Sequence, residues 1–280
     1  MKPGGSAQEI GAAWWDGLRR ALSALGTGPD AAAVHQARVY ARRMRVVLSA
    51  GRAEIGRGPA RRAARALARL AKALGPVRDW EVRTVFLERC RKSAPAGAIR
   101  KGISLLLRSA RRQQTEAQRG LRRAVRDFVR RDAVAALSRA AGVPADGRRV
   151  RKKIRKQLLS LQRYSKLPSA GPRQHALRLK IRKLRYRLEF LAAWPDGFRS
   201  SFVSAVKKIQ DLLGAAHDAD IQQRWVAKEG ILLPEPLRRG VVPYVREQCR
   251  REKKAACAEL RKYWRRFAQD MPWEYSAKAP

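Results

Sequence analysis

Long segments of this chain combine strong helix formers with apolar positions that fall on one face of a helix. Ala, Leu, Arg and Lys dominate these segments, and each of these residue types favours the α-helix. No segment alternates apolar and polar residues with a period of two for long enough to indicate a strand. The pattern therefore predicts an all-α protein.

Glycines and prolines divide the chain into two similar series of helices. The first series is predicted at residues 7–25, 29–50, 59–74, 78–92 and 97–140. The second series is predicted at residues 148–167, 172–194, 197–213, 217–229 and 236–270. Pro29 and Pro172 stand where a proline fits the first turn of a helix. Gly75 and Gly214 stand where a glycine commonly follows the end of a helix.

The two series share a duplicated sequence. Residues 35–48 align without a gap with residues 175–188, at an offset of 175 − 35 = 140. A second match joins residues 74–82 to residues 213–221, at an offset of 213 − 74 = 139. Two matches at nearly the same offset indicate that one half of the chain repeats the other.

The duplication predicts two antiparallel helical bundles with pseudo-twofold symmetry. We assign the first lobe to residues 7–141 and the second lobe to residues 147–270, with the Gly- and Pro-containing segment 141–147 as the hinge. Both lobes together would form one domain.

The charge of the chain is its unusual property. Lys and Arg number 64 against 23 Asp and Glu, which gives a formal net charge of +41. Such an excess opposes compaction by self-repulsion and attracts anions over a long range. A neutral metabolite would not require it, whereas a polyphosphate, a nucleic acid or an anionic membrane surface would use it.

The repeated helix places its basic residues on one face. At 100° per residue, Arg38, Arg42 and Arg45 fall within about 80° of His35, beside an apolar stripe that would pack into the bundle. No carboxylate is interleaved on this face, so the like charges weaken the helix by some tenths of a kcal/mol per pair. A solvated basic face is the alternative, but its repetition at the same angular positions favours a phosphate-binding surface.

Arginine and histidine suit phosphate for different reasons. The planar guanidinium group pairs with two phosphate oxygens at once, and an imidazole beside phosphate shifts toward its protonated form. Other basic residues could extend this surface, with a solvated outer face as the alternative for each: Arg65, Arg69, Lys72, Arg78, Lys152, Lys153, Lys156, Lys207, Lys208 and His217. We expect Asp79 and Asp218 to cap the next helix or to hold a nearby arginine.

These motifs resemble those of a known family. The pattern His-x-x-Arg-x-x-x-Arg-[Arg/Lys]-x-Arg occurs twice, each time followed by Leu-Gly-x-x-x-Asp, and it is similar to the CHAD family, the "conserved histidine α-helical domain", over roughly residues 7–270. The resemblance implies two four-helix-type bundles flanking a basic groove or pore, and binding of inorganic polyphosphate. The residues that the motif implies for binding are His35, Arg38, Arg42, Arg43, Arg45, His175, Arg178, Arg182, Lys183 and Arg185.

The resemblance also raises the question of a second domain in the same chain. CHAD domains often occur beside a CYTH-type triphosphate-processing domain, whose mark is an alternating Glu-x-Glu-x-Lys strand. The sequence contains no such strand, so we expect a stand-alone CHAD protein. It also lacks a P-loop, a GxSxG elbow and an HExxH helix, and we therefore expect a binding protein that is not an enzyme and has no cofactor.

Metal binding by the protein itself is not expected. No two histidines are spaced by three or four residues, so the spacing gives no helical metal site, although the three histidines could still meet in space. Divalent cations carried by the polymer would not require them.

Non-specific nucleic-acid binding is the alternative function, because phosphate contacts dominate affinity there too. Single-strand binders stack bases on exposed aromatic side chains. The seven tryptophans fall mostly in apolar stripes or near helix ends, so we expect them mainly in the core.

The remaining features favour a cytoplasmic protein, located at polyphosphate granules if the family resemblance holds. Cys90, Cys249 and Cys257 form no CxxC motif, which argues against a zinc ribbon or a disulfide framework and for free thiols. No apolar run approaches the ~18–20 residues that span a bilayer. The residues after Met1 lack the apolar core of a signal peptide.

Overall fold

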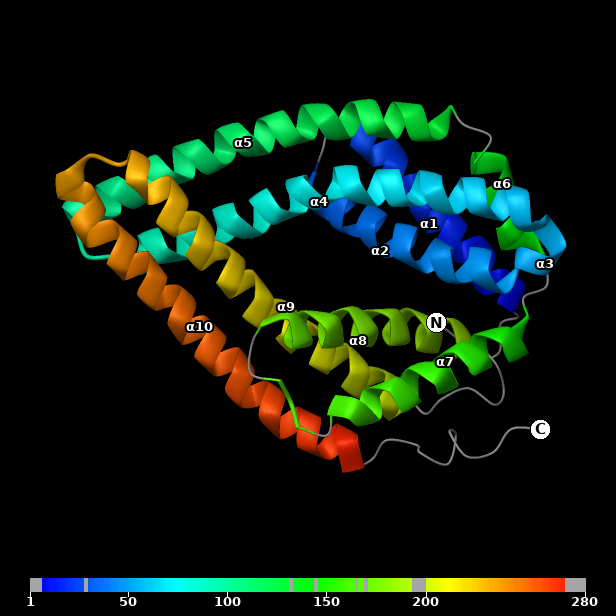
Figure 1. Ribbon diagram of the computed structural model, residues 1–280. Helices are drawn as coiled ribbons and strands as arrows, with labels where there is room; N and C mark the ends of the chain where they lie inside the picture. The colour runs from blue at the N-terminus through cyan, green and yellow to red at the C-terminus, as the bar shows by residue number, and fades with distance from the viewer. Residues whose placement is uncertain are drawn as a thin grey trace.

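The computed structural model describes residues 7–27, 30–130, 133–143, 146–164, 166–168, 171–192 and 200–269. Nearly all of these residues are helical and none is in a strand, which confirms the all-α prediction (Figure 1). The helices are α1 Ala7–Thr27, α2 Ala31–Ala50, α3 Arg52–Ile55, α4 Arg57–Ser93, α5 Ala98–Val129, α6 Ala133–Gly142, α7 Gly147–Leu161, α8 Gly171–Leu191, α9 Ser200–Glu229 and α10 Glu235–Gln269. Short 3-10 turns follow α7 and α9.

Two long antiparallel helix pairs form the frame of the molecule. α4 packs against α5, and α9 packs against α10. The pairs meet at the left end of Figure 1, where α5 also packs against α10. Toward the right they diverge, and the shorter helices α1, α2 and α6 lie near the first half of α4 while α7 and α8 lie near the first half of α9 (Figure 1).

The order of packing is the same in the two halves of the chain. α1 contacts α2, α2 contacts α4 and α4 contacts α5; in the second half α7 contacts α8, α8 contacts α9 and α9 contacts α10. This order follows the duplicated sequence. The division into two pseudo-symmetric lobes, at 7–141 and 147–270, stays a prediction.

Both hydrophobic clusters draw on both halves of the chain. The larger cluster includes Trp14 and Phe190, whose rings lie 5.5 Å apart. The smaller cluster fills the end where the long helices meet, and it includes Phe86 of α4 and Val241 of α10. The core therefore joins the halves instead of leaving each with a core of its own.

Five of the seven tryptophans lie in the described part of the chain, and all five are buried or half-buried. Trp14, Trp15 and Trp264 are buried, while Trp80 and Trp225 are half-buried and pack against the smaller cluster. Trp194 and Trp273 lie outside the described residues.

Two predicted helix breaks are wrong. α4 runs through Gly75 and Pro76, and α9 runs through Gly214. An internal proline removes one backbone hydrogen bond, but Leu74 and Val77 on either side of it are fully buried, and their burial holds the helix together. The segments predicted at 59–74 and 78–92, and at 197–213 and 217–229, are thus two continuous helices.

The long helix predicted at 97–140 is wrong in the opposite sense. α5 ends at Val129, and α6 begins at Ala133. α6 packs against α1 and α4, which a single straight continuation of α5 would not allow. Pro172 lies in the first turn of α8, as predicted, whereas Pro29 lies outside the described residues.

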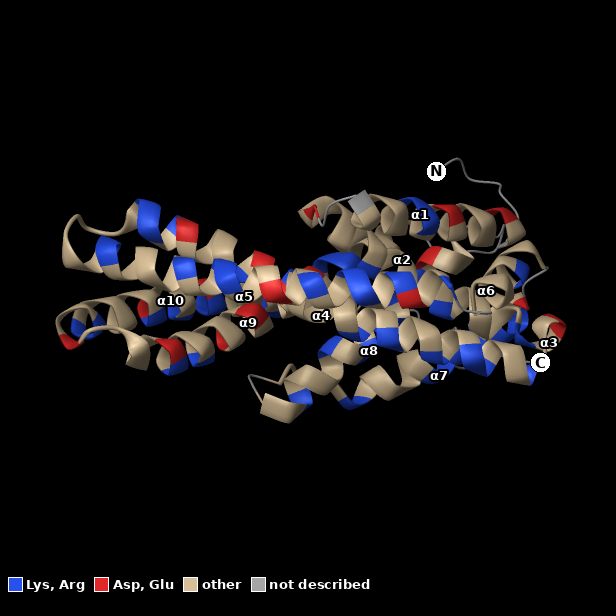
Figure 2. Cartoon of the chain, turned by 90° about the horizontal axis from the view of Figure 1, so that it is seen from above, with Lys and Arg blue, Asp and Glu red and all other residues tan. Residues whose placement is uncertain are grey.

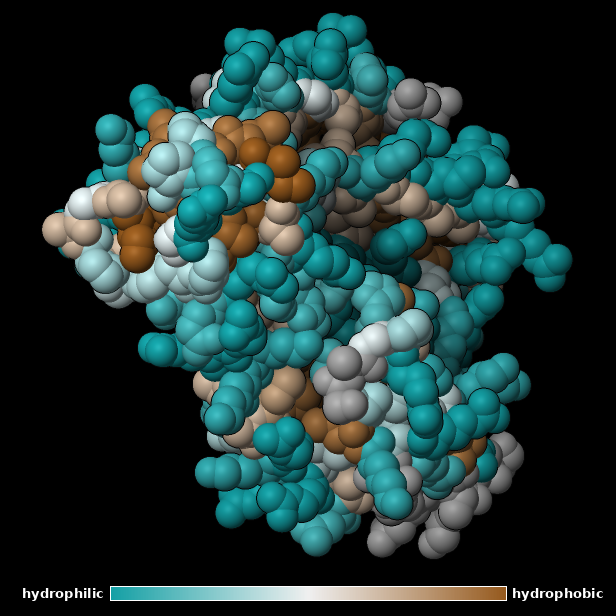
Figure 3. Space-filling view, turned by 60° about the vertical axis from the view of Figure 1, so that its left-hand side comes forward, coloured by the Kyte–Doolittle hydropathy of each residue, from teal (hydrophilic) through white to brown (hydrophobic). Residues whose placement is uncertain are grey.

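The surface is mostly polar and charged. Lys and Arg are spread along the helices instead of gathering on one of them (Figure 2). Hydrophilic residues cover most of the face in Figure 3, and apolar residues gather toward the end of the molecule that is on the left in Figure 1. No described helix is both long enough and apolar enough to cross a membrane.

A buried arginine links α4 to α9. The Nε atom of Arg83 donates a hydrogen bond to Gln222 Oε1 at 3.0 Å, and its guanidinium carbon lies 4.0 Å and 4.6 Å from the rings of Trp80 and Trp225. Arg83 and Gln222 occupy equivalent places in the duplicated sequence, because 222 − 83 = 139. Burial lowers the pKa of Arg83 to about 10.

We expect Arg83→Ala to lower the free energy of unfolding by about 2–4 kcal/mol, since it leaves a cavity and deprives a buried amide of its donor. Urea unfolding followed by circular dichroism measures this change. Arg89→Ala on the same helix is the control: Arg89 is 62% exposed in an ion pair with Glu252, and its loss should cost less than about 1 kcal/mol. Equal losses in the two variants would contradict a structural role for Arg83.

Candidate functional site

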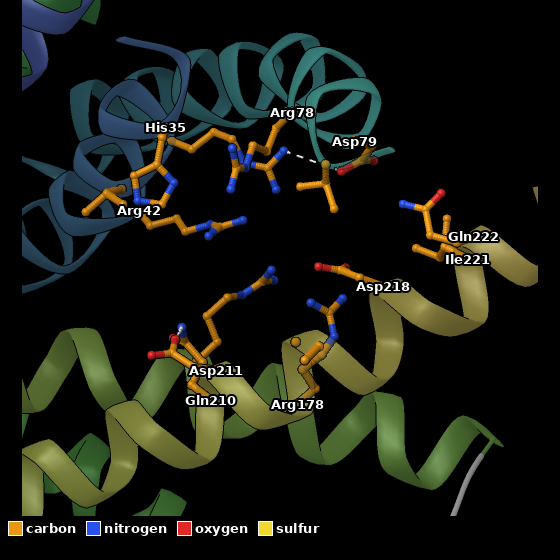
Figure 4. A pocket seen from close by; sticks show the side chains of 16 residues that line it. His35, Arg42, Arg78, Asp79, Arg178, Gln210, Asp211, Asp218, Ile221 and Gln222 are labelled. Atoms are coloured by element: carbon orange, nitrogen blue, oxygen red, sulfur yellow. Dashed lines mark hydrogen bonds and ion pairs between the residues drawn. The ribbon is translucent and has the colours of Figure 1, made fainter. Parts of the chain in front are cut away.

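A cavity of about 360 Å³ opens between α2 and α4 on one side and α8 and α9 on the other. The side chains that line it include five arginines and three aspartates, so its charged groups sum to 5 − 3 = +2: Arg38, Arg42, Arg78, Arg178, Arg182, Asp79, Asp211 and Asp218. Figure 4 shows guanidinium groups from opposite walls directed toward the same space. This arrangement suits an anion with several negative groups.

The repeated basic helices are α2 and α8, and they face the cavity from opposite sides. Their apolar stripes are buried, as the sequence predicted, at Ala37 and Ala41 in α2 and at Leu177 and Ile181 in α8. Burial of these stripes fixes the rotation of each helix. It thereby turns one face of α2 and one face of α8 toward the common space.

Arg38 is anchored on α4. Its Nη1 atom donates hydrogen bonds to the backbone oxygens of Leu74 at 3.3 Å and Gly75 at 3.0 Å, and it lies 3.7 Å from Asp79 Oδ1. Asp79 and Asp218 were expected to cap a helix or to hold an arginine. Because α4 and α9 are continuous, neither caps a helix, and Asp79 holds Arg38.

The matching residues of the second half lie across the cavity. Arg178 follows Arg38 by 140 residues and Asp218 follows Asp79 by 139. Burial lowers the pKa of Arg178, against the opposing charge of Asp218. Burial raises the pKa of Asp218, against the opposing charge of Arg178, and Asp79 adds to the rise. The Nε atom of Arg178 is buried without a hydrogen-bond partner.

The arginines also act on one another across the cavity. Burial, together with the charges of Arg42 and Arg178, lowers the pKa of Arg182 to about 10. Burial likewise lowers the pKa of Arg38, with Arg42 as the second cause. These guanidinium groups repel one another in the free protein, and a bound anion would relieve that repulsion.

Two other residues of the basic motif form ion pairs with Glu189 of α8. Arg43 donates to Glu189 at 2.9 Å and lies over the rings of Trp14 and Tyr40. Arg185 donates to the same carboxylate at 2.6 Å. Arg43 therefore ties α2 to α8, whereas the Arg185 pair lies within α8. Arg45 and Lys183 are exposed and do not line the cavity.

The histidines divide between two places. His35 lines the main cavity, and its pKa is lowered by partial burial and then by Arg78. His175 and His217 lie together, with ring centroids 5.4 Å apart, in a second hollow of about 390 Å³. Among the described residues, no group of three His, Cys, Asp or Glu side chains could hold a metal ion.

His217 is shifted away from its charged form. The pKa of His217 is lowered to about 4 by burial, then by the charge of Arg178 and by His175. The protonation that the sequence led us to expect beside phosphate therefore requires the anion itself, because the free protein favours the neutral ring.

The further candidate cations lie in different surroundings. Arg78 lines the main cavity, where it is held by buried Glu81 at 3.3 Å. Lys208 pairs with Glu259 at 2.8 Å, and Lys153 donates to Ser49. Burial lowers the pKa of Lys153, as does Arg149 next to it. The remaining candidates are exposed side chains outside the cavity: Arg65, Arg69, Lys72, Lys152, Lys156 and Lys207.

Asp211 and Gln222 also line the cavity, although neither belongs to a motif that was identified in the sequence. Asp211 lies 3.9 Å from Arg185. Both residues stand on the helical face of Asp218, seven residues before it and four residues after it, which is the spacing of neighbours on one face. This signal becomes visible only once α9 is known to be continuous.

Comparisons with known proteins agree on one family. A family model described as the CHAD domain matches residues 11–227. The crystal structure of the CHAD domain from the plant Ricinus communis superposes with a TM-score of 0.70 at 21% identity, covering 97% of this chain and 94% of that chain. PptA from Streptomyces chartreusis superposes with a TM-score of 0.70 at 18% identity, covering 92% and 97%. A search of curated proteins gave no match.

We expect the stability of the protein to fall as the pH drops from about 6.5 toward 4, in part through His217. The unfolded chain binds a proton on this ring near its ordinary pKa of 6.5, whereas the folded chain does so only near 4. The unfolded state then holds more protons in this window, so acid favours unfolding. The change is measured as the urea midpoint at pH 7 and at pH 5.

The variant His217→Gln should lose less stability over this interval than the unchanged protein, because it has no proton to take up at this position. His35 keeps its own contribution in both proteins. An identical pH dependence in the two proteins would show that His217 is not shifted.

Proposed function

Because this chain belongs to the CHAD domain family, we propose that it binds inorganic polyphosphate, without hydrolysing it, in the cavity between α2, α4, α8 and α9. CHAD domains are linked to polyphosphate. One observation carries the proposal: guanidinium groups from three helices converge on one space, at Arg38, Arg42, Arg78, Arg178 and Arg182.

The mutual effect of these arginines supports an anionic ligand. Arg42 and Arg178 lower the pKa of Arg182, so the free cavity holds cations at an electrostatic cost. A phosphate group accepts charge-assisted hydrogen bonds from several guanidinium groups at once. A bound phosphate group would attract the guanidinium groups on both sides of the cavity and so offset their mutual repulsion.

A linear polymer of phosphate matches the distribution of charge better than a single phosphate does. The cavity lining sums to only +2, while the whole chain carries +41, so most cations lie outside it. A polymer held in the cavity can reach these cations, and each further contact is then intramolecular. We therefore infer affinity that rises with chain length and falls steeply with salt, as counterions are released on binding.

The aspartates of the cavity fit a binding role better than a catalytic one. Asp79 lies 3.7 Å from Arg38, and Asp211 lies 3.9 Å from Arg185. Each of these two carboxylates faces a guanidinium group, which suits the positioning of a cation for an anionic ligand. A non-catalytic binder of this kind would be carried to polyphosphate granules in the cytoplasm by its ligand.

Non-specific nucleic-acid binding remains the second candidate, favoured by the cations spread over the surface (Figure 2). Base stacking would require free aromatic faces. Trp14, Trp15 and Trp264 are buried, and Trp80 and Trp225 stack on Arg83. The tryptophans that are described therefore favour a ligand without bases.

We expect Arg42→Ala combined with Arg182→Ala to weaken binding of long-chain polyphosphate by roughly tenfold or more, since each removes a charge-assisted contact. These two arginines line the cavity and, unlike Arg38, donate no hydrogen bond to the backbone of a described residue. Isothermal titration calorimetry at fixed salt measures the affinity.

The matched control is Arg65→Ala combined with Arg69→Ala. It removes the same charge from the exposed surface of α4, and its effect should be several times smaller. Equal losses in both double variants would mean that the cavity is not the binding site and that the protein responds to net charge alone.

A competition assay separates the two candidate functions. We expect labelled long-chain polyphosphate to stay bound at about 150 mM salt against a large excess of single- or double-stranded nucleic acid, counted as phosphate, because a narrow cavity admits a polymer without bases. Displacement at equal phosphate would support a general polyanion binder. The recovered polymer, measured by gel electrophoresis, should keep its length.

A further inference from the structure

Three carboxylates line a cavity that we assign to an anionic polymer. Asp79 and Asp211 are exposed toward it, and Asp218 is half-buried. Each of them repels a phosphate group that enters. A site that served only to attract phosphate would contain no aspartate, so their presence calls for a separate explanation.

Asp79 acts on the arginine that is most firmly placed. The Nη1 atom of Arg38 contacts three acceptors of α4, of which two are backbone oxygens and the third is Asp79 Oδ1 at 3.7 Å. Only this third acceptor carries a charge. Asp79 therefore neutralises Arg38, while the two backbone oxygens also anchor it.

Asp218 holds the equivalent position in the second half of the chain. It lines the cavity together with Arg178 (Figure 4), and each charge shifts the pKa of the other toward its ionised form. It also acts on Arg38, and Asp79 acts on Arg178. Two arginines and two aspartates thus form a neutral set at equivalent positions of the duplicated sequence. Arg78 pairs with Glu81, which leaves Arg42 and Arg182 as the lining cations without an ion pair to a described carboxylate.

We propose that Asp79 and Asp218 set the ligand selectivity of the cavity: they act as internal counterions that keep out short phosphate anions and admit a long polyphosphate chain. The inference rests on the proposed function, because it concerns the same cavity. Beyond the proposed function, the inference names short phosphate anions as the ligands that the cavity excludes.

The physical reason lies in the number of contacts that each ligand can make. A short anion such as tripolyphosphate must compete with a carboxylate for Arg38 or Arg178 and then remain beside it, and the like charges repel. A long chain meets the same repulsion at the same two places. It offsets that repulsion through contacts with cations inside and outside the cavity, which follow intramolecularly once the first contact is made.

Selectivity of this kind comes from repelling the wrong ligand as well as from attracting the right one. Removing both carboxylates should therefore help a short anion more than a long one. The affinity ratio between the two ligands is the quantity to measure, because a general gain in positive charge would strengthen both.

The experiment compares the unchanged protein with Asp79→Asn combined with Asp218→Asn, which keeps the shape of both side chains. Calorimetric titrations with tripolyphosphate and with long-chain polyphosphate are run at about 150 mM salt with EDTA, so that no divalent cation bridges carboxylate and polymer. We expect affinity for tripolyphosphate to rise on the order of tenfold and affinity for the long chain to rise less than about threefold. The ratio of the two affinities then falls.

The control is Asp16→Asn combined with Asp127→Asn. Both residues are exposed, on α1 and α5, and the control changes the net charge by the same amount. Its affinity ratio should equal that of the unchanged protein. Thermal melting checks that all three proteins are folded.

Two results would overturn the inference. An unchanged ratio in the cavity variant would mean that the aspartates do not select, and weaker binding of both ligands would mean that they position the arginines. Failure of the proposed function is distinct from either, because the unchanged protein would then bind no long-chain polyphosphate at all.

Discussion

The packing of α2 and α8 must overcome the repulsion between arginines that the two helices direct toward the same cavity. The pKa of Arg182 is lowered in part by the nearby charges of Arg42 and Arg178. Like charges repel, so these side chains would not come together on their own. The buried apolar stripes of the same two helices bring them together. Burial of each aliphatic side chain contributes on the order of 1–3 kcal/mol, which exceeds a repulsion of some tenths per pair.

Ion pairs decide which of the basic residues remain available. Arg43 pairs with Glu189 and thereby ties α2 to α8, while Arg185 pairs with the same carboxylate within α8. Arg83 stacks between two tryptophans and ties α4 to α9. These arginines belong to the framework. Because they absorb part of the charge, the residues left facing the cavity form a small group with a modest net charge, while the long-range field comes from the rest of the surface.

The local signals of the sequence identified the helices but misjudged where they end. Helix propensity and apolar periodicity depend on neighbours along the chain, so the all-α class could be predicted from them. The pair Gly75–Pro76 carries the local signal of a helix end, yet α4 continues through it because Leu74 and Val77 are buried. That outcome depends on other helices, which local signals do not describe.

The duplicated basic face, and thus the residue types of the site, could be predicted from the amino-acid sequence alone. The sequence could not determine which of those residues meet, because contacts such as Arg38 with Asp79 and Arg43 with Glu189 join segments that are 41 and 146 residues apart. Only the tertiary structure separated the arginines that line the cavity from those in the framework. An arginine next to a carboxylate forms an ion pair, whereas one without such a partner is available to a ligand. Packing of the core decides which carboxylates lie near which arginines.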